Sequence, residues 1–457
     1  MTSLIVITRY NPLALLASRA FLLLMVSGAY ASEPAYAQAV DVLTPEESVR
    51  IGLDHNARLQ AAQSDAAEAR AAYRQVRAGQ LPSIQSQASY TRLSGNIPEA
   101  EFAIPGLDTT FTVLPVELNR FHSEVSVEQP LFTGFRLRNQ IRAADHEADA
   151  AELLAEQEAA GVAFEIRSSY WRLYEAVAVH NATAAALDRV EEHLRNVENQ
   201  VEVGAALTSD LLSAQTRRTE VLLEQVEAEN RMLVAQLELN RLLGRALDAP
   251  VQTVAEIEVE PVSEELETLV ARAIEARPHL LALEEQVRGL EARFDAARGA
   301  WLPEITLVGR YVYARPNPYV FTEQNEFRAT WEAGSALRWS LWDGGRRRAE
   351  TSATAARLDA AEARLTDARE QVAVEVSRQV LELNRATEAV QVALQHVREA
   401  DETLRVTIRQ HEEGMVLAAA VLEAEEAARM AQARRAQARA DYAIARAAIL
   451  NALGQVW

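Results

Sequence analysis

The feature that most constrains this fold is an abrupt change of hydrophobic period that occurs twice in the chain. Before each change, apolar and polar residues alternate, which is typical of a β-strand, and after it apolar residues recur at helical spacing. The two junctions are the segments 130–136 and 340–346, and each has an aromatic residue followed by glycine and then arginine. The pattern predicts, at both places, a strand that passes directly into a long helix.

The spacing of the glycines indicates that the chain is an internal duplication. Three pairs of glycines share a separation of 210 residues, namely Gly134 and Gly344, Gly204 and Gly414, and Gly244 and Gly454. Pro82 and Pro303 are 221 residues apart, so the 11 extra residues lie in the loop between the two strands of the first repeat. A fixed period of this kind indicates a repeated structural unit.

The repeat divides the chain into four predicted segments. They are a signal peptide at 1–37, a first structural repeat at 38–244, a linker at 245–263 and a second structural repeat at 264–457. Each repeat is predicted to contain a helix, two strands, a long helix and a shorter helix, in that order. The fold class is therefore mixed α/β with a two-fold internal repeat.

The first helix and the strands of each repeat have clear sequence signals. Thr44 and Glu47 have the spacing of a capping box, and Pro45 fits the first helical position, so a helix is predicted from there to about Arg77. In the second repeat Ser263 is predicted to cap a helix that runs to about residue 298. Alternating segments at 83–91, 121–128, 304–313 and 331–341 are predicted strands, and a long loop rich in proline and glycine joins the first two.

The two long helices are predicted to run from the junctions to Gly204 and Gly414. Each would be about 67 residues and about 100 Å long at 1.5 Å per residue. Heptad spacing predicts coiled-coil seams that contain Val190, Leu194, Val197 and Val201 in the first helix, and Val376, Val380, Leu383, Val390, Leu394 and Val397 in the second. Thr208, Ser209 or Asp210 is expected to cap the helix that follows the first tip.

The strands offer one apolar and one polar face. Each has about 10 residues, a length that spans a bilayer when the strand is tilted. The polar faces, predicted to line water, carry Gln85, Gln87, Glu124, Glu128, Glu304, Arg310 and Arg338. The aromatic residues that are predicted to lie at the interface between membrane and water are Trp301, Tyr311, Tyr313, Trp331, Trp339 and Trp342. Four strands cannot close a barrel, so several copies would each have to contribute four.

The composition excludes several classes of function. A net charge of −20 argues against nucleic acid as a partner, and the arginine-rich run 429–439 is interpreted as a solvated helix face. The absence of cysteine excludes disulfides, thiolate metal sites and a cysteine nucleophile. The eight histidines are scattered without the spacing of metal ligands. We therefore predict no catalytic residues, no metal and no cofactor.

The N-terminus reads as an export signal. Arg9 and Arg19 precede the apolar run 20–26, and small-x-small cleavage sites end at Ala31 and Ala37. Cleavage after either alanine fits the pattern. No later segment reaches about 18 uninterrupted apolar residues, so a β-barrel is the predicted route into a membrane.

The ordered set of elements resembles the TolC-like family of outer-membrane efflux ducts. The residues that carry the resemblance are the junction segments 129–136 and 340–346 and the hairpin tip 203–215, and it covers essentially the whole mature chain. The resemblance implies a homotrimer whose 12-stranded barrel lies in the lipid of a Gram-negative outer membrane. An α-helical coiled-coil tunnel would continue from this barrel into the periplasm.

The resemblance also implies the function and the partners. Such a duct is not an enzyme; it is the passive exit path of a tripartite efflux or type I secretion system, and its hairpin tips dock a periplasmic adaptor attached to an inner-membrane pump. The residues assigned to docking are Gly204, Leu207, Thr208, Gly414, Met415 and Leu417. Gly134, Gly344 and Gly345 would form the bend between barrel and helix, with Trp342 at the interface and Asp343 as a helix cap.

In this family, carboxylates on the second hairpin form a ring that narrows the tunnel mouth. The first of those positions is Ala420 here and the second is Glu423, while Asp210 follows Gly204 in the first hairpin. Glu423 and Asp210 are therefore the predicted constriction, with a solvated helix acid as the alternative interpretation of Glu423. The alternative to the duct as a whole is a periplasmic or surface coiled-coil scaffold without transport activity.

Overall fold

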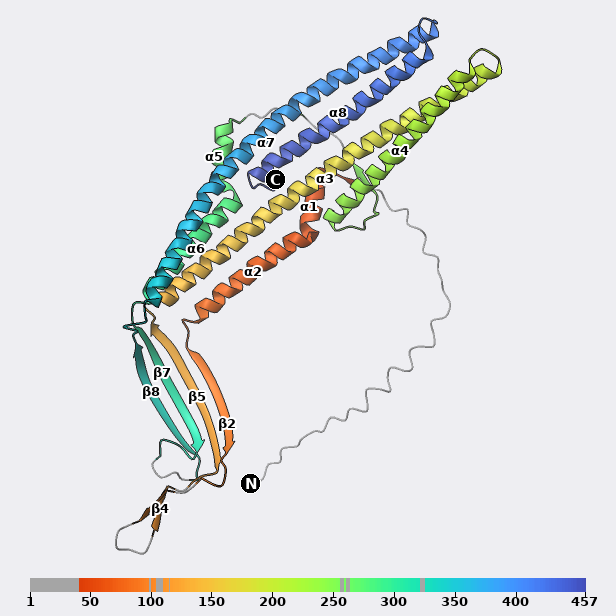
Figure 1. The fold of residues 1–457 in the computed structure, drawn as a ribbon. Coiled ribbons are helices and arrows are strands. Elements are labelled where there is room, and N and C mark those ends of the chain that lie inside the picture. Colours follow the sequence, from red (N-terminus) through yellow and green to blue (C-terminus); the bar gives the residue numbers. More distant parts are fainter. Residues whose placement is uncertain are drawn as a thin grey trace, which may run out of the picture.

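The structure is a computed structural model that describes residues 41–97, 100–103, 110–114, 116–254, 259, 264–320 and 325–457. It is a long helical rod with a narrow β-sheet extending from one end (Figure 1). The predicted signal peptide, its cleavage sites and the predicted cap Ser263 lie outside the described residues. Within the described part of the chain, no helix is both long and apolar enough to cross a membrane.

The duplication predicted from the glycine spacing is present in the helices. The long helices α3 (Arg136–Glu202) and α7 (Arg346–Glu412) have 67 residues each, as predicted. The hairpin partners α4 (Thr208–Leu243) and α8 (Ala418–Ala452) have 36 and 35 residues. The predicted seam of α7 is confirmed, because Val376, Val380, Leu383, Val390 and Val397 are buried and Leu394 is partly buried.

The prediction of one continuous helix before the strands is wrong in both repeats. The structure has two helices in each: α1 (Pro45–His55) and α2 (Ala57–Ala78), then α5 (Leu266–Ala276) and α6 (Pro278–Gly299). Asn56 is extended, and its side chain accepts hydrogen bonds from the backbone of Arg58 at 2.9 Å and Leu59 at 3.3 Å. The second break lies at Arg277, which is extended, and α6 begins at the next residue, Pro278. The helical conformation is disfavoured for a residue that precedes a proline. The capping box of Thr44 and Glu47 is confirmed.

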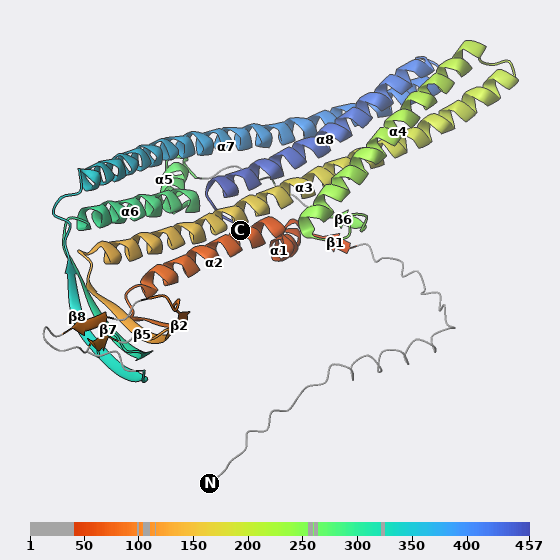
Figure 2. The ribbon, with the colours of Figure 1, turned by 60° about the horizontal axis from the view of Figure 1, so that its bottom comes forward.

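The helices form one curved layer with two free edges. In the half near the hairpin tips the order across the layer is α4, α3, α8 and α7, and in the half near the strands it is α2, α3, α6 and α7 (Figures 1 and 2). Helices α4 and α2 therefore lie at one edge, and α7 lies at the other. Packing against α3 or α7 places the apolar stripe of every shorter helix inside the layer.

One face of the layer is covered by small elements from both repeats. Strand β1 (Asp41–Leu43) pairs in parallel with β6 (Val251–Thr253), which lies in the segment predicted to be a linker. The Tyr170 hydroxyl of α3 is 2.8 Å from the carbonyl oxygen of Leu43 and 3.0 Å from that of Val254, and it accepts from the Val254 amide at 2.8 Å. Helix α1 packs on α3 around the buried residue Val49, next to Leu43 and Tyr170, and its counterpart α5 packs on α7 around the buried residue Leu269.

The sheet contains two strands from each repeat. Strands β2 (Ser83–Arg92), β5 (Asn119–Phe132), β7 (Glu304–Arg315) and β8 (Arg328–Arg338) form it in that spatial order, and every pair is antiparallel. All four predicted strands are confirmed. The predicted loop between the first two contains a further hairpin, β3 (Ala100–Ala103) with β4 (Thr110–Leu114), which was not predicted.

The register places the aromatic side chains and most of the large aliphatic side chains of the sheet on one face, while Val308, Val312 and Ala314 lie on the other. Ser86, Val125, Tyr311 and Trp331 are aligned across it, and the exposed apolar residues of this face include Ile84, Val125, Val127, Tyr311, Trp331 and Leu337. On the opposite face Arg310 forms ion pairs with Glu124 at 2.8 Å and Glu332 at 2.6 Å. The predicted split into an apolar and a polar face is therefore confirmed.

Candidate functional site: collar and hairpin tips

The first strand-to-helix bend is built on two backbones that touch. Gly134 and Phe135 have left-handed backbone conformations, with φ of 61° and 64°. A Cβ on Gly134 would collide with the carbonyl oxygen of Gly299, at the end of α6, and with the side chain of Leu302. Gly134 is therefore required by close contact as well as by its φ angle. We call the two bends, at 132–136 and 342–346, together with segment 299–302, the collar.

The second bend is held by an aspartate and an arginine. Gly344 and Gly345 have φ of 70° and 89°, and the Asp343 carboxylate accepts hydrogen bonds from the backbone of Gly345 and of Arg347, both at 3.1 Å. The predicted cap at Asp343 is thus confirmed. Partial burial opposes ionisation of Asp343, but the hydrogen bonds from Arg347 and Gly345 hold its pKa below the ordinary value.

Three consecutive arginines open α7, although a helix N-terminus disfavours positive charge. The structure explains the middle one. Arg347 is only 6% exposed; its Nε donates to Asp343 at 2.8 Å and its Nη1 donates to the Ala300 carbonyl oxygen at 3.3 Å. Its guanidinium also lies 4.7 Å from the centre of the Trp301 ring. Arg347 therefore joins the start of α7 to the end of α6, while Trp342 is 86% exposed and faces outward.

The two hairpin tips have the same backbone construction. Gly204 and Gly414 end the long helices with φ of 75° and 76°. In each tip the residue after the glycine donates back to a helix carbonyl, Ala205 to Gln200 at 2.7 Å and Met415 to Gln410 at 2.8 Å. This pattern is a glycine C-cap of the Schellman type. The tips also expose the apolar side chains Val203, Leu207, Met415 and Leu417.

The predicted constriction residues have different local roles. Helix α4 begins at Thr208 with Leu207 at the N-cap, so the predicted N-cap at Thr208, Ser209 or Asp210 is wrong. Asp210, the third residue of the helix, accepts a hydrogen bond from the Leu207 amide at 3.1 Å through its carboxylate. In the second tip the N-cap is Leu417, and among the described residues no side chain caps the helix. The counterpart of Asp210 there is Ala420, which has no carboxylate to accept a hydrogen bond. There His411 Nδ1 lies 3.0 Å from the Val416 carbonyl oxygen. Glu423 is exposed on α8, and it lies in a different hairpin from Asp210.

An ionic network that sequence analysis missed connects the two hairpins. Arg217 of α4 pairs with Glu426 of α8 at 2.5 Å, and Arg429 of α8 pairs with Glu224 of α4 at 3.1 Å and also with Glu426. The hydrogen bond from Arg429 and the charge of Arg217 hold the pKa of Glu426 below its ordinary value, against burial. The interpretation of run 429–439 as a solvated face is therefore wrong for Arg429, which packs between helices far apart in sequence.

Three possible metal ligands meet between α3 and α6. His146, Asp149 and Glu285 bring ligand atoms within 4.8 Å of one another. Each carboxylate already has a cationic partner, because Arg70 binds Asp149 at 2.7 Å and Arg288 contacts Glu285. His146 Nδ1 is 2.7 Å from Glu285. The cluster is an ionic network that joins α2, α3 and α6, and it accounts for His146 as a satisfied histidine.

The comparisons with known proteins agree with this geometry. The family model described as outer membrane efflux protein matches residues 51–245 and 269–455, so the chain belongs to that family. A comparison with curated protein sequences gives no match. Among solved structures, the chain is similar to the CmeC outer membrane channel of Campylobacter jejuni, with 17% identity, a TM-score of 0.76 and coverage of 90% of this chain and 85% of that one.

Two further structures show the same fold. A membrane protein from Pseudomonas aeruginosa has 21% identity and a TM-score of 0.74, and the match covers 90% of this chain and 93% of that one. The outer membrane protein VceC from Vibrio cholerae has 18% identity and a TM-score of 0.73, with 90% and 96% coverage. These likenesses confirm the mixed fold with a helical tunnel that continues a barrel, although a single copy does not close the barrel.

Family membership establishes the class of function. Proteins of this family are passive outer-membrane channels, not enzymes; they are homotrimers that work with adaptor proteins and inner-membrane pumps. This chain is accordingly an outer-membrane efflux channel of a tripartite pump that extends into the periplasm. The alternative of a coiled-coil scaffold without transport activity is therefore wrong.

The collar generates a first testable prediction. Gly134→Ala and Gly344→Ala impose similar φ strain, about 1 kcal/mol each, but only at Gly134 does the new methyl group meet the backbone of another element. We expect Gly134→Ala to lower the yield of folded trimer in outer membranes several-fold and Gly344→Ala to lower it much less. Equal yields of the two variants, measured by gel migration without boiling, would contradict the contact between Gly134 and Gly299.

Proposed function

We propose that three copies of the chain join edge to edge into one continuous duct, with β8 of each copy paired to β2 of the next. The observation that carries this proposal is that the sheet has two unpaired edge strands, β2 and β8. Their backbone amides and carbonyls need partners, because an open edge is not tolerated in lipid. Since all neighbouring strands are antiparallel, β8 and the next copy's β2 also run antiparallel. The apolar face of the sheet then meets lipid, and the polar face lines the bore.

The repeat supplies the register of this missing strand pair. Strand β5 corresponds to β8 at a separation of 210 residues, and β2 corresponds to β7 at a separation of 221. Val125 of β5 is aligned with Tyr311 of β7. The equivalent pair between copies is Ser335 with Tyr90 of the next copy. The same correspondence applies to the helical layer, where α7 at one edge of a copy meets α4 and α2 at the edge of the next.

Cysteine cross-linking tests this register in a chain that has no cysteine of its own. We expect the variant Ser335→Cys with Tyr90→Cys to form disulfide-linked trimers on oxidation, because directly opposed residues of antiparallel strands lie within disulfide range. The control variant, Ser335→Cys with Ser89→Cys, places the second thiol on the other face of the sheet. Equal cross-linking in both variants, or none in either, would contradict the register.

We also propose that the hairpin tips dock the periplasmic adaptor. Support comes from the exposed apolar residues Leu207, Met415 and Leu417, of which Leu417 is 79% exposed. The ends of the α3–α4 and α7–α8 hairpins lie at the far end of the rod from the sheet (Figure 1). Gly204 and Gly414 fix the tight turns that present them, and Thr208 begins the helix that leaves the first tip. A small apolar surface carried on two rigid turns suits recognition of another helical hairpin.

Replacing both tip glycines by isoleucine tests the docking proposal. A β-branched residue cannot adopt the left-handed conformation without strain, so the turns are expected to rearrange. We expect cross-linking of the channel to its adaptor to fall at least about tenfold, with trimer yield unchanged because the tips are remote from the sheet. Asparagine at both positions is the matched control, since it tolerates this conformation. Unchanged adaptor cross-linking in the isoleucine variant would remove the tips as the docking site.

We propose Glu423 as the acidic constriction of the tunnel mouth, assisted by the Asp210 tip. Its support is an exposed carboxylate on α8 close to the second tip. The proposed ring of copies would repeat this carboxylate three times around the axis. Planar-bilayer recordings provide the test. In Glu423→Ala we expect a larger closed-state conductance and weaker block by divalent cations, because a ring of carboxylates is lost. Glu220→Ala, an exposed acid on α4, is the control, and a Glu423→Ala channel that records like this control would exclude the gate.

A further inference from the structure

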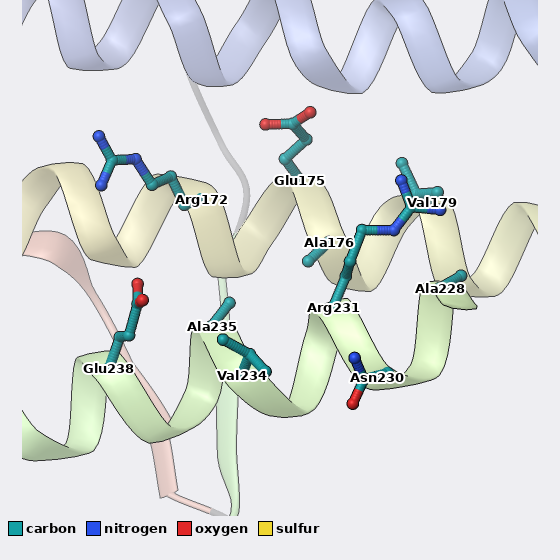
Figure 3. A pocket seen from close by; sticks show the side chains of 10 residues that line it. All are labelled: Arg172, Glu175, Ala176, Val179, Ala228, Asn230, Arg231, Val234, Ala235 and Glu238. Atoms are coloured by element: carbon teal, nitrogen blue, oxygen red, sulfur yellow. The ribbon is translucent and has the colours of Figure 1, made fainter. Parts of the chain in front are cut away.

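A pocket in the middle of the helical rod combines apolar walls with charged groups. It lies between α3 and α4 and encloses about 460 Å³ (Figure 3). Ala176, Val179 and Val234 supply apolar surface. Its charged groups are Arg172 and Glu175 from α3 and Arg231 and Glu238 from α4. In Figure 3, Glu175 points away from α4 toward the neighbouring helix α8, and Arg231 points from α4 toward α3.

The second repeat has charged residues at three of the equivalent positions, with every sign reversed. Adding the repeat length of 210 residues converts Arg172 to Glu382, Glu175 to Arg385 and Arg231 to Asp441. Glu382 and Arg385 of α7 form an ion pair at 2.6 Å. The charge of Asp441 acts on both Glu175 and Arg385, so the two sets lie at one level of the rod. The charged residues of the pocket and their three counterparts lie on α4, α3, α8 and α7. We call these seven residues the girdle: Arg172, Glu175, Arg231, Glu238, Glu382, Arg385 and Asp441.

The girdle lies on the uncovered face of the helical layer. Glu175 and Arg172 are turned about 140–160° around α3 from Tyr170, at 100° per residue, and Tyr170 binds the backbone next to the β1–β6 pair. Helix α1 packs beside Tyr170 on that covered side, and α5 is its counterpart in the second repeat, packed on α7. Asp441 follows Glu423 by 18 residues, or five full turns, and so shares its face of α8. In a ring of three copies, an open bore requires the uncovered face inside.

We propose that the girdle is an ion-selectivity belt around the middle of the tunnel, which favours cations at neutral pH and anions after protonation of Glu175 and Asp441. The proposal rests on the ring of three copies proposed above. With all groups ionised, each copy contributes four carboxylates and three guanidinium groups, a net charge of −1. Protonation of two carboxyls makes this +1 in each copy. Charged rings in a confined pore select ions by the sign of their net charge.

The environments of the two carboxyls make them the groups that titrate first. Burial raises the pKa of Glu175, and the charge of Asp441 raises it further, while Arg231 and Arg172 lower it. Burial also raises the pKa of Asp441, which Arg385 lowers and Glu382 raises. Among the described residues, neither carboxylate has an ion-pair partner within 4.0 Å. A raised carboxyl pKa means that the proton is taken up at a higher pH than by an ordinary acid.

Reversal potentials in a potassium chloride gradient test the girdle directly. Full-length trimers in planar bilayers are compared at about pH 7.5 and about pH 5, a range in which ordinary carboxyls stay ionised. All channels carry Glu423→Gln, so that the proposed acid at the tunnel mouth contributes nothing. We expect the ratio of chloride to potassium permeability to rise at least about twofold on acidification, as for a change in local potential on the order of kT.

Variants separate the girdle from the rest of the duct. The double variant Glu175→Gln with Asp441→Asn is expected to prefer chloride at both pH values. It should lose most of the change in permeability ratio between the two pH values, and each single variant should lose about half of that change. Glu165→Gln is the control, because Glu165 is also on α3 but pairs with Arg58 of α2 at 2.7 Å. If the double variant keeps the full pH effect, the selectivity role of the girdle is contradicted and the duct is not. Where the double variant fails to assemble, the same outcome in both single variants contradicts that role. Glu423→Gln trimers without any of the girdle substitutions that do not conduct would contradict the duct itself.

Discussion

The unsatisfied backbone of two edge strands governs this structure. A four-stranded sheet with one apolar face cannot leave β2 and β8 unpaired in a membrane, because each free amide or carbonyl would cost several kcal/mol there. Only closure with other copies satisfies both edges and keeps the apolar face outside. The helical layer has the same topology, with α4 and α2 at one edge and α7 at the other. The sheet and the layer therefore demand the same ring of copies.

The collar couples these two architectures. The sheet must end and a helix must begin within a few residues, and the structure achieves this with left-handed residues such as Gly134 and Gly345. The two repeats solve the problem differently. The first uses contact between the backbones of Gly134 and Gly299, and the second uses the Asp343 carboxylate together with Arg347. A duplicated sequence has thus kept its geometry while its stabilising contacts diverged.

Divergence between the repeats extends to the charges on the uncovered face of the rod. Arg172 and Arg231 occupy positions whose equivalents in the second repeat are acids, and Glu175 faces Asp441 across the boundary between the repeats. Two identical repeats would place an arginine, the counterpart of Arg231, at position 441 beside Glu175. Reversal of the signs places an aspartate there, so that like charges meet between α3 and α8. It leaves one half-buried acidic pair, Glu175 and Asp441, where the two repeats meet.

The sequence by itself determined the elements and their repetition. The change from period two to period 3.6 located the strands and the 67-residue helices, since these periods reflect local geometry. It also located Gly204 and Gly414, because helix ends require a left-handed residue there. The breaks at Asn56 and Pro278 were missed, since apolar spacing continues across both, although each residue is itself a known start signal.

Only the tertiary structure decided which side chains meet. The partners Arg217 with Glu426, Arg347 with Trp301 and Tyr170 with the β1–β6 pair lie 46 to 209 residues apart in the chain, and no local period encodes them. The short strand β6 was invisible for the same reason, because three residues carry no periodicity and gain their conformation only by pairing with β1. Local spacing fixes the elements, but burial and charge pairing between distant segments fix how they pack.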